Sequence, residues 1–537
     1  MTLHFASIWE AVADYAPDRP AVICDDVKLS WQQYEQRAAR IAAALQEAGL
    51  GAGSKVGLYL HNSSQYLESQ FAVFKIDGCP INVNYRYKAD ELVYLLENSD
   101  AEALVFQSSY AMRIWEIKDR LPNIKLFLQV DDGSAEVLLD FATAYESVQR
   151  DFEPLPPIEH DPEGVYMLYT GGTTGMPKGV MYNVVDFSTA LTGLGAASQE
   201  MTPPTTLAEY REYLRATDAA PVSLPACPMM HGTGMWLGCM VPHAQGGTVV
   251  ATSKLGLDPD HLWELVQEHR VNDLVIVGDA FAKPLLASLQ DAATRNRPYR
   301  PDSLKQIISS GVMWSAEVKQ ALLEHIDCAL VDVMGSSEGG MGSSVTSRDM
   351  TAPTAKFALN EGVKVFTDDG REVEPGSKEI GKLATSGSVP LGYYKDEAKS
   401  AATFREINGV RYSFPGDYAS VAADGSITLL GRGSACINTA GEKVFPEEVE
   451  EALKRHPQLY DVLVVGLPDD RFGERVVAVA SAQDGATLDP QGVIDFAREQ
   501  LAGYKVPKQV LVVDQVQRAP NGKADYKWAR KTAEQVG

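Results

Sequence analysis

A ten-residue run rich in glycine and threonine constrains this chain most strongly. It reads Thr-Gly-Gly-Thr-Thr-Gly-Met-Pro-Lys-Gly over Thr170–Gly179 and follows Gly164–Tyr169, whose apolar and aromatic residues predict a short buried strand. Val184–Leu194, further along, has the composition of a helix. Glycines let backbone amides approach an anion closely, while the threonine hydroxyls and Lys178 add donors and positive charge. The run therefore predicts a polyphosphate-binding loop between a strand and a helix, in preference to an ordinary glycine-rich surface turn.

Length and composition bound the architecture. A chain of 537 residues is too long for one compact core, so two or more domains are expected. The formal net charge of −24, from 48 basic and 72 acidic residues, disfavours nucleic acid or an anionic membrane surface as partner. The six cysteines are scattered without a Cys-x-x-Cys pair, and neither a signal-like N-terminus nor an apolar run of about 20 residues is present. We therefore expect a cytoplasmic protein without a transmembrane segment, in a reducing compartment.

Helical and strand patterns alternate along the first part of the chain. Trp31–Ala48 and Ser64–Ile76 have helical periodicity, whereas Lys55–Leu60 and Cys79–Asn84 read as strands. Elements of this length in this order predict an α/β fold with largely parallel sheets. After Gly433 the pattern changes to that of a small domain of helices and strands. We therefore predict a division into residues 1–432 and 433–537, which gives the second part a normal domain size.

Two segments resemble motifs of other enzyme classes. Gly335–Gly340 contains Gly-x-Ser-x-Gly, the frame of a serine-hydrolase nucleophile elbow with Ser337 as nucleophile. That elbow needs a helix directly after the serine, but the glycines and serines that follow are poor helix formers. It also needs a later histidine, and His456 is the one that remains. Gly376–Lys382 fits most of a phosphate-loop frame, but Leu383 stands where a metal-binding hydroxyl is required, so we expect a turn.

The motifs, taken in order, resemble those of the ATP-dependent adenylate-forming enzymes, which include acyl- and aryl-CoA synthetases, luciferases and peptide-synthetase adenylation domains. The resemblance covers nearly the whole chain, from the helix that ends at Ala48 to Lys523, near the C-terminus. This chain has Gly171 where the family's signature loop usually has serine, and Met334 where an aromatic residue is usual. The segments that carry the resemblance are Thr170–Gly179, Gly335–Glu338, Phe414–Asp417, Leu430–Arg432, Gly441–Glu450 and Pro520–Lys523.

The resemblance implies a role for individual residues. Lys523 matches the family's catalytic lysine, Glu338 and Thr174 would bind Mg²⁺, and His231 would lie beside the acyl pocket. Ser434 stands at the pivot between the two domains, where the family commonly has Asp or Lys. The residues implied in catalysis are Lys523, Thr174, Glu338 and His231, and those implied in binding the nucleotide or CoA are Thr170, Gly171, Gly172, Thr173, Thr174, Gly175, Lys178, Gly311, Val312, Met334, Gly335, Ser336, Ser337, Asp417, Arg432, Gly441 and Lys523.

The resemblance also implies a fold and a reaction. The fold would be a large N-terminal domain of stacked α/β subdomains with a β subdomain, plus a small mobile α+β C-terminal domain. The cofactors would be ATP, Mg²⁺ and coenzyme A, and the reaction would convert a carboxylic acid through an acyl-adenylate to its CoA thioester. We expect a medium- or long-chain fatty acid or a steroid side-chain acid, because Gly278–Phe281 and the glycine-rich run resemble those of bacterial synthetases of lipid or sterol side-chain acids. Small residues could also leave room for a bulky acyl group. These residues are Gly232, Gly234, Gly238 and Ala280.

Alternatives remain at this point. A fatty acyl-AMP ligase that passes the acyl group to another acceptor is the nearest rival, and a luciferase-like oxidation uses the same adenylation motifs. A non-catalytic ATP-binding regulator would lack Lys523 or Glu338, and both are present. The Ser337 hydrolase is the most distant alternative. A homodimer is a further expectation that no motif tests.

Overall fold

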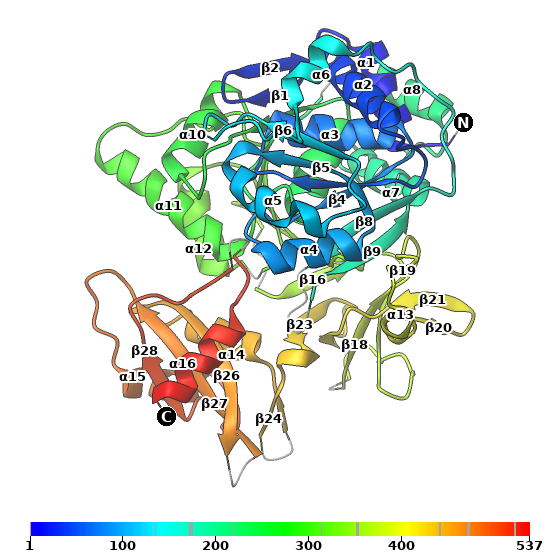
Figure 1. The fold of residues 1–537 in the computed structure, drawn as a ribbon. Coiled ribbons are helices and arrows are strands. Elements are labelled where there is room, and N and C mark those ends of the chain that lie inside the picture. Colours follow the sequence, from blue (N-terminus) through cyan, green and yellow to red (C-terminus); the bar gives the residue numbers. More distant parts are fainter. Residues whose placement is uncertain are drawn as a thin grey trace.

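The computed structural model describes residues 2–134, 136–170, 176–217, 220–312, 314–350, 354–377, 379–439, 442–469, 473–519 and 522–536, without the side chains of residues 434 and 536. Figure 1 shows a large upper body formed by the earlier part of the chain and a smaller lower body, coloured orange to red, formed by its end. Among the described residues, no helix combines the length and apolar character needed to cross a membrane.

A parallel five-stranded sheet forms early in the chain. Its order is β4-β3-β5-β6-β7, and every pairing in it is parallel. The capping box of Ser30 and Gln33 starts the helix α2, which buries Trp31, Tyr34 and Ile41 on one face. The predicted α/β fold is confirmed. The elements are α1 (Phe5–Tyr15), α2 (Trp31–Glu47), β3 (Lys55–Tyr59), α3 (Ser64–Lys75), β4 (Cys79–Asn82), α4 (Ala89–Asn98), β5 (Ala101–Gln107), α5 (Ala111–Ile117), β6 (Leu126–Val130), β7 (Thr143–Ala144) and α6 (Tyr145–Asp151).

A second, longer sheet begins β2-β1-β11-β10-β12-β13-β14 and continues through β15 and β16 into an antiparallel part. The pairings from β1 to β14 are parallel, and those from β14 onward are antiparallel. The carboxyl ends of β10, β12, β13 and β14 therefore meet along one edge, where ligands bind in open α/β sheets. The elements are β1 (Pro20–Cys24), β2 (Val27–Ser30), α8 (Leu207–Ala216), β10 (Val222–Pro225), α9 (Val241–Ala244), β11 (Thr248–Ala251), α10 (Pro259–Glu268), β12 (Asp273–Ile276), α11 (Gly278–Thr294), β13 (Gln306–Ser310), α12 (Ala316–His325), β14 (Ala329–Ser336), β15 (Gly339–Thr346), β16 (Lys356–Leu359), β17 (Val363–Phe366), β18 (Ile380–Thr385), α13 (Glu397–Thr403), β20 (Phe404–Ile407), β21 (Val410–Ser413), β22 (Asp417–Val421) and β23 (Ile427–Arg432).

The glycine-rich run differs from the prediction of a loop between a strand and a helix. It connects β8 (Val165–Thr170) with a second strand, β9 (Lys178–Asn183), and only then does α7 (Val184–Ala197) begin. A third strand, β19 (Gly392–Tyr393), pairs with β9 to complete a small antiparallel sheet. A Cβ at Gly179 would lie 2.8 Å from the ring of Tyr169, so part of the glycine content serves close strand packing. The prediction missed β9 because its alternation is short and interrupted by this glycine.

The two competing enzyme motifs have clear structural outcomes. Ser337 and Glu338 form the turn between the antiparallel strands β14 and β15, with Ser336 paired to Gly339. No helix follows the serine, so the nucleophile-elbow geometry is excluded. The segment around Gly376 is a turn that leads into β18, where Lys382 forms an ion pair with Asp368 at 2.8 Å. The expected turn is confirmed there.

The end of the chain forms another sheet, in the order β25-β24-β27-β26 with β28 beside β27. It packs separate apolar clusters against helices on its two faces, which include Val449 and Val493 on one side and Ala529 on the other. The elements are β24 (Ile437–Thr439), β25 (Glu442–Val444), α14 (Pro446–Leu453), β26 (Leu459–Asp469), β27 (Gly473–Ala482), α15 (Pro490–Gln500), β28 (Gln509–Val512) and α16 (Tyr526–Val536).

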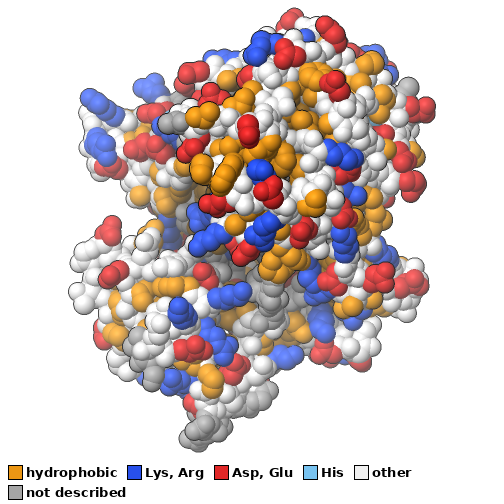
Figure 2. Space-filling model, in the orientation of Figure 1, with side chains coloured by type: hydrophobic (Ala, Val, Ile, Leu, Met, Phe, Trp, Pro, Cys, Tyr) orange, Lys and Arg blue, Asp and Glu red, His pale blue; other side chains and the backbone are white. Residues whose placement is uncertain are grey.

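Charged side chains are spread over the molecular surface. Figure 2 shows acidic and basic groups interspersed over the visible face of both bodies. A ligand of high negative charge therefore needs a local site that supplies positive groups.

Candidate active site

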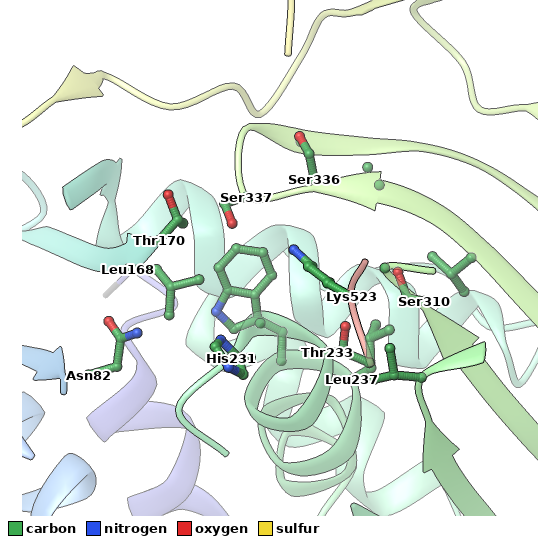
Figure 3. Close-up of a pocket in the computed structure, with 18 of the residues that line it drawn as sticks. Asn82, Leu168, Thr170, His231, Thr233, Leu237, Ser310, Ser336, Ser337 and Lys523 are labelled. Atoms are coloured by element: carbon green, nitrogen blue, oxygen red, sulfur yellow. The ribbon is translucent and has the colours of Figure 1, made fainter. Parts of the chain in front are cut away.

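A cavity of about 640 Å³ lies where the two bodies meet. Figure 3 shows Lys523 reaching into it between the Ser336–Ser337 turn on one side and His231 and Thr233 on the other. The cavity brings together several predicted site residues from distant parts of the chain. These are Thr170, His231, Gly311, Gly335, Ser336, Ser337 and Lys523.

Glu338 comes directly after Ser337, in a turn that several hydrogen bonds stabilise. Its carboxylate Oε1 accepts a hydrogen bond of 2.7 Å from the Tyr393 hydroxyl, and its backbone N–H donates to Ser336 Oγ at 3.1 Å. The Tyr182 hydroxyl donates to the Ser337 carbonyl oxygen at 3.0 Å. A carboxylate with one oxygen engaged in this way keeps acceptor capacity on the other, and carboxylate oxygen is the donor type that Mg²⁺ prefers. The Glu338 carboxylate therefore fits the implied metal, whereas Thr174 lies outside the described residues.

Lys523 is an exposed residue whose side chain lines the cavity. Desolvation by the surrounding protein and the positive charge of Arg432 lower the pKa of the Lys523 ammonium, while Glu338 and Asp417 act in the opposite direction. The backbone of Gly311 lies close to the Lys523 side chain, since a Cβ added at Gly311 would lie 3.9 Å from Lys523 Cε. A positive charge that projects into a protein cavity attracts an anion bound in the same cavity.

His231 lines the same cavity as a neutral side chain. Burial, together with the charge of Lys523, lowers the pKa of His231 to about 4. At neutral pH the imidazole therefore contributes a hydrogen-bonding, aromatic surface and no positive charge. This property suits contact with an acyl group better than binding of phosphate.

Asp417 and Arg432 face each other across two antiparallel strands. They are register partners at the ends of β22 and β23, and the Arg432 guanidinium lies 3.4 Å from the Asp417 carboxylate. Burial raises the pKa of Asp417, and the charge of Arg432 opposes that shift. The two residues predicted to contact the ribose therefore form one charged pair at the hairpin end.

The remaining predicted residues lie either outside the cavity lining or outside the described part of the chain. Lys178 pairs with Asp396 and lies 5.9 Å from the centre of the Tyr393 ring, outside the cavity lining. Met334 is buried in an apolar cluster, and Val312 packs against another. Predicted residues that lie outside the described part of the chain are Gly171, Gly172, Thr173, Thr174, Gly175 and Gly441.

Two residues that no sequence motif singled out stabilise the walls of the cavity. Asn82 accepts a hydrogen bond from the Tyr169 backbone N–H at 2.7 Å and donates to the carbonyl oxygens of Tyr169 and Met230 at 2.8 and 2.7 Å. Trp236 donates from its indole nitrogen to the Tyr166 hydroxyl at 2.9 Å. A polar residue at the carboxyl end of a parallel strand is a signal that could have identified Asn82.

Comparison with known proteins defines the class to which this fold and cavity belong. The family described as AMP-binding enzyme matches residues 9–394, and the family described as AMP-binding enzyme C-terminal domain matches residues 448–523. The chain belongs to the AMP-binding enzyme family.

Named relatives of this chain are CoA ligases. It is 40% identical over 544 residues to a 3-oxocholest-4-en-26-oate–CoA ligase of Rhodococcus rhodochrous, with 99% of this chain and 96% of the relative covered. It is also 40% identical over 546 residues to a medium/long-chain-fatty-acid–CoA/3-oxocholest-4-en-26-oate–CoA ligase of Mycolicibacterium smegmatis, with 100% and 97% covered.

Solved structures share the fold over the whole chain. The anthranilate CoA ligase AuaEII in complex with anthranoyl-AMP matches with a TM-score of 0.85 at 20% identity, covering 100% of this chain and 98% of that one. ATP-bound MatB from Rhodopseudomonas palustris matches with a TM-score of 0.82 at 24% identity, and both chains are fully covered. At these identities the likeness establishes the fold alone.

Proposed function

We propose that this protein is an AMP-forming acyl-CoA synthetase that uses ATP, Mg²⁺ and CoA. The observation that carries the proposal is the presence of Lys523 in one cavity with the Ser336–Ser337 turn and His231. The Lys523 ammonium in the cavity and the neighbouring Glu338 carboxylate, with the Mg²⁺ it would hold, can together balance charge on a substrate carboxylate and a phosphate. The kinship with CoA ligases over the whole chain supports the same reaction.

In the first half-reaction, a substrate carboxylate oxygen attacks the α-phosphorus of ATP and pyrophosphate leaves. The Lys523 ammonium donates hydrogen bonds to both reacting groups and stabilises the charge that moves between them in the transition state. Asp417 accepts hydrogen bonds from the ribose hydroxyls, and Thr170 and the loop that follows it bind phosphate. Glu338 and Thr174 would hold Mg²⁺, which neutralises phosphate charge when it is bound.

In the second half-reaction, the CoA thiol attacks the acyl carbonyl and AMP leaves. We propose that residues 433–537 rotate about Ser434, which withdraws Lys523 and brings the segment at Gly441 to the cavity. The contact that must break lies between α14 and β23, where Glu447 packs against Gly431. The separate apolar clusters of the C-terminal sheet support movement of this part as one unit.

The apolar end of the cavity supports a bulky lipid or steroid acid as substrate. Its lining there includes Phe187, Leu191, Leu194, Trp236 and Leu237. The expectation that small residues supply the room was wrong for Gly234 and Gly238. A Cβ at Gly234 would lie 2.4 Å from the Pro228 carbonyl oxygen, and one at Gly238 would lie 2.7 Å from Pro225 Cβ. These glycines allow close packing against backbone and leave no space for a ligand.

Mass spectrometry of reactions with ATP, Mg²⁺ and a panel of acids tests the proposal. The panel spans short, long, aromatic and sterol side-chain carboxylates, each with and without CoA. We expect an acyl-CoA of the lipid or steroid class and stoichiometric AMP. An acyl-AMP that accumulates equally with and without CoA would instead indicate a fatty acyl-AMP ligase.

Lys523→Ala tests the assignment of the two half-reactions. We expect acyl-AMP formation to fall about 100-fold or more, since removal of one group that stabilises transition-state charge has this effect. Thioester formation from supplied acyl-AMP should be retained, because Lys523 leaves the cavity before that step. Lys531→Ala removes an exposed lysine on α16 and is the matched control. Equal loss of both half-reactions would contradict the assignment.

We also propose a cytoplasmic location and a homodimer. The six cysteines are free, and five of them are buried, which fits a reducing compartment. Cell fractionation and light scattering of the purified protein test these two expectations.

A further inference from the structure

Two tyrosine hydroxyls from one small sheet meet the turn that carries Glu338. Tyr393 on β19 donates to the Glu338 carboxylate at 2.7 Å, and Tyr182 on β9 donates to the Ser337 carbonyl oxygen at 3.0 Å. The two strands are antiparallel neighbours, with Tyr393 opposite Val180 and Gly392 opposite Met181. One sheet therefore holds both the backbone and the side chain of the turn.

Both tyrosine side chains are fixed in position, since Tyr182 and Tyr393 are 2% and 6% exposed. A fixed donor selects one orientation of a carboxylate that would otherwise rotate freely.

The same sheet also carries the ends of the phosphate-binding run. Thr170 ends β8 and Lys178 begins β9, where the two residues are paired in register. Lys178 pairs with Asp396, three residues after Tyr393, and Asp396 caps the start of α13. A change in the position of this sheet would therefore move the run and the Glu338 turn together.

We propose that Tyr393 is a positioning residue that orients the Glu338 carboxylate toward the metal of the bound nucleotide, and that Tyr182 secures the turn from the same sheet. The inference rests on the proposed function, in which Glu338 binds the metal. Tyr393 donates to one oxygen of Glu338, and the other oxygen would be available to the cation. The small sheet thereby links the Glu338 turn to Thr170 and Lys178, the described ends of the phosphate-binding run.

The test is binding of the magnesium complex of α,β-methylene-ATP, measured by calorimetry on the full-length chain. Tyr393→Phe removes one oxygen and keeps the ring. We expect its affinity for the magnesium complex to fall about tenfold, as for the loss of a hydrogen bond to a charged group. Affinity for the metal-free analogue in EDTA should be unchanged. In the adenylation assay, the half-saturating Mg²⁺ concentration should rise by a similar factor, with the rate restored at high Mg²⁺.

The neighbouring tyrosine provides a matched control. The Tyr394 hydroxyl donates to Asp100 at 2.7 Å, so Tyr394→Phe makes the same atomic change one residue away, without touching the turn. It should bind both forms of the analogue as the parent protein does. Tyr182→Phe should weaken binding of the magnesium complex by less than Tyr393→Phe, because it loosens the turn without freeing the carboxylate.

Two outcomes would overturn the inference. Tyr393→Phe could bind the magnesium complex with unchanged affinity, as the Tyr394→Phe control does, or it could lose affinity equally for both forms of the analogue. Failure of the proposed function is distinguishable, because the parent protein itself would then form no acyl-adenylate with any acid in the panel.

Discussion

Gly431 packs against Glu447 where the two bodies meet, and Gly431→Ala should disturb this contact selectively. A Cβ at this position would lie 2.2 Å from Glu447 Oε2 and 2.7 Å from its Cδ, whereas ordinary contact begins at 3.4 Å. The Glu447 carboxylate would have to retreat by about 1 Å against α14. Overpacking of this kind costs about 1–3 kcal/mol, and it acts only while α14 rests on β23.

This free-energy cost should lower the rate of one half-reaction. At a factor of ten for each ~1.4 kcal/mol, acyl-AMP formation should slow roughly 5- to 150-fold. Thioester formation from supplied acyl-AMP should be preserved, since the proposed rotation separates Gly431 from Glu447. Rapid-quench measurement of each half-reaction in single turnover, with ATP affinity measured alongside, provides the assay.

Gly425→Ala is the control that distinguishes the effect of the steric clash from that of backbone strain. Gly431 has a φ of +124°, and Gly425, in the hairpin turn between β22 and β23, has a φ of +80° with nothing within 4 Å of its Cβ position. Gly425→Ala therefore introduces left-handed strain without a clash and should leave both half-reactions near the parent rates. If Gly431→Ala slowed both half-reactions equally, or Gly425→Ala had the same effect on acyl-AMP formation, the reasoning would be refuted.

Three further changes have defined outcomes. Burial raises the pKa of Glu447, so the folded state binds more protons than the unfolded state between pH 4.5 and the raised pKa. The stability of the fold should therefore fall as the pH rises through this window. Glu447→Gln should reduce this dependence of stability on pH, measured by thermal melts across pH. Trp236→Ala should enlarge the apolar end of the cavity and shift relative kcat/KM toward bulkier acids in a competition assay, whereas an unchanged order of preference would argue against acyl contact. Buried Lys75 pairs with Glu10 at 2.5 Å and with Glu35 at 2.7 Å. Lys75→Met should lower the free energy of unfolding in urea by about 3–5 kcal/mol, because both carboxylates would lose their partner. A loss below ~1 kcal/mol would mean that water replaces the ion pairs.

Local signals predicted many of the elements. The capped start of α2, its periodic apolar face and the short apolar strands of the first sheet follow from patterns within about twenty residues. The strand β9 was missed because its alternation is short and includes Gly179. The partners of β9, which are β8 and β19, are separated by more than two hundred residues in the chain.

In the candidate site, too, some residues follow from local motifs and others depend on contacts between distant segments. Motifs predicted Lys523, Glu338, Asp417 and Arg432 as site residues, because the proposed reaction requires groups of that chemistry. Tyr393 could not, because its role depends on a hydroxyl that reaches a carboxylate 55 positions earlier. Asn82 likewise acquires its role from contacts with Tyr169 and Met230, which only the folded chain brings near.

The sequence alone determined the class of fold, the chemical groups available and their order, since periodicity and motif spacing are properties of neighbouring residues. The tertiary structure decided that Ser337 lies in a hairpin turn and that two of the glycines near the acyl end serve packing. It also decided that two tyrosines hold the Glu338 turn. The physical reason is that strand pairing and close packing depend on which distant segments meet, and no local pattern encodes their distances.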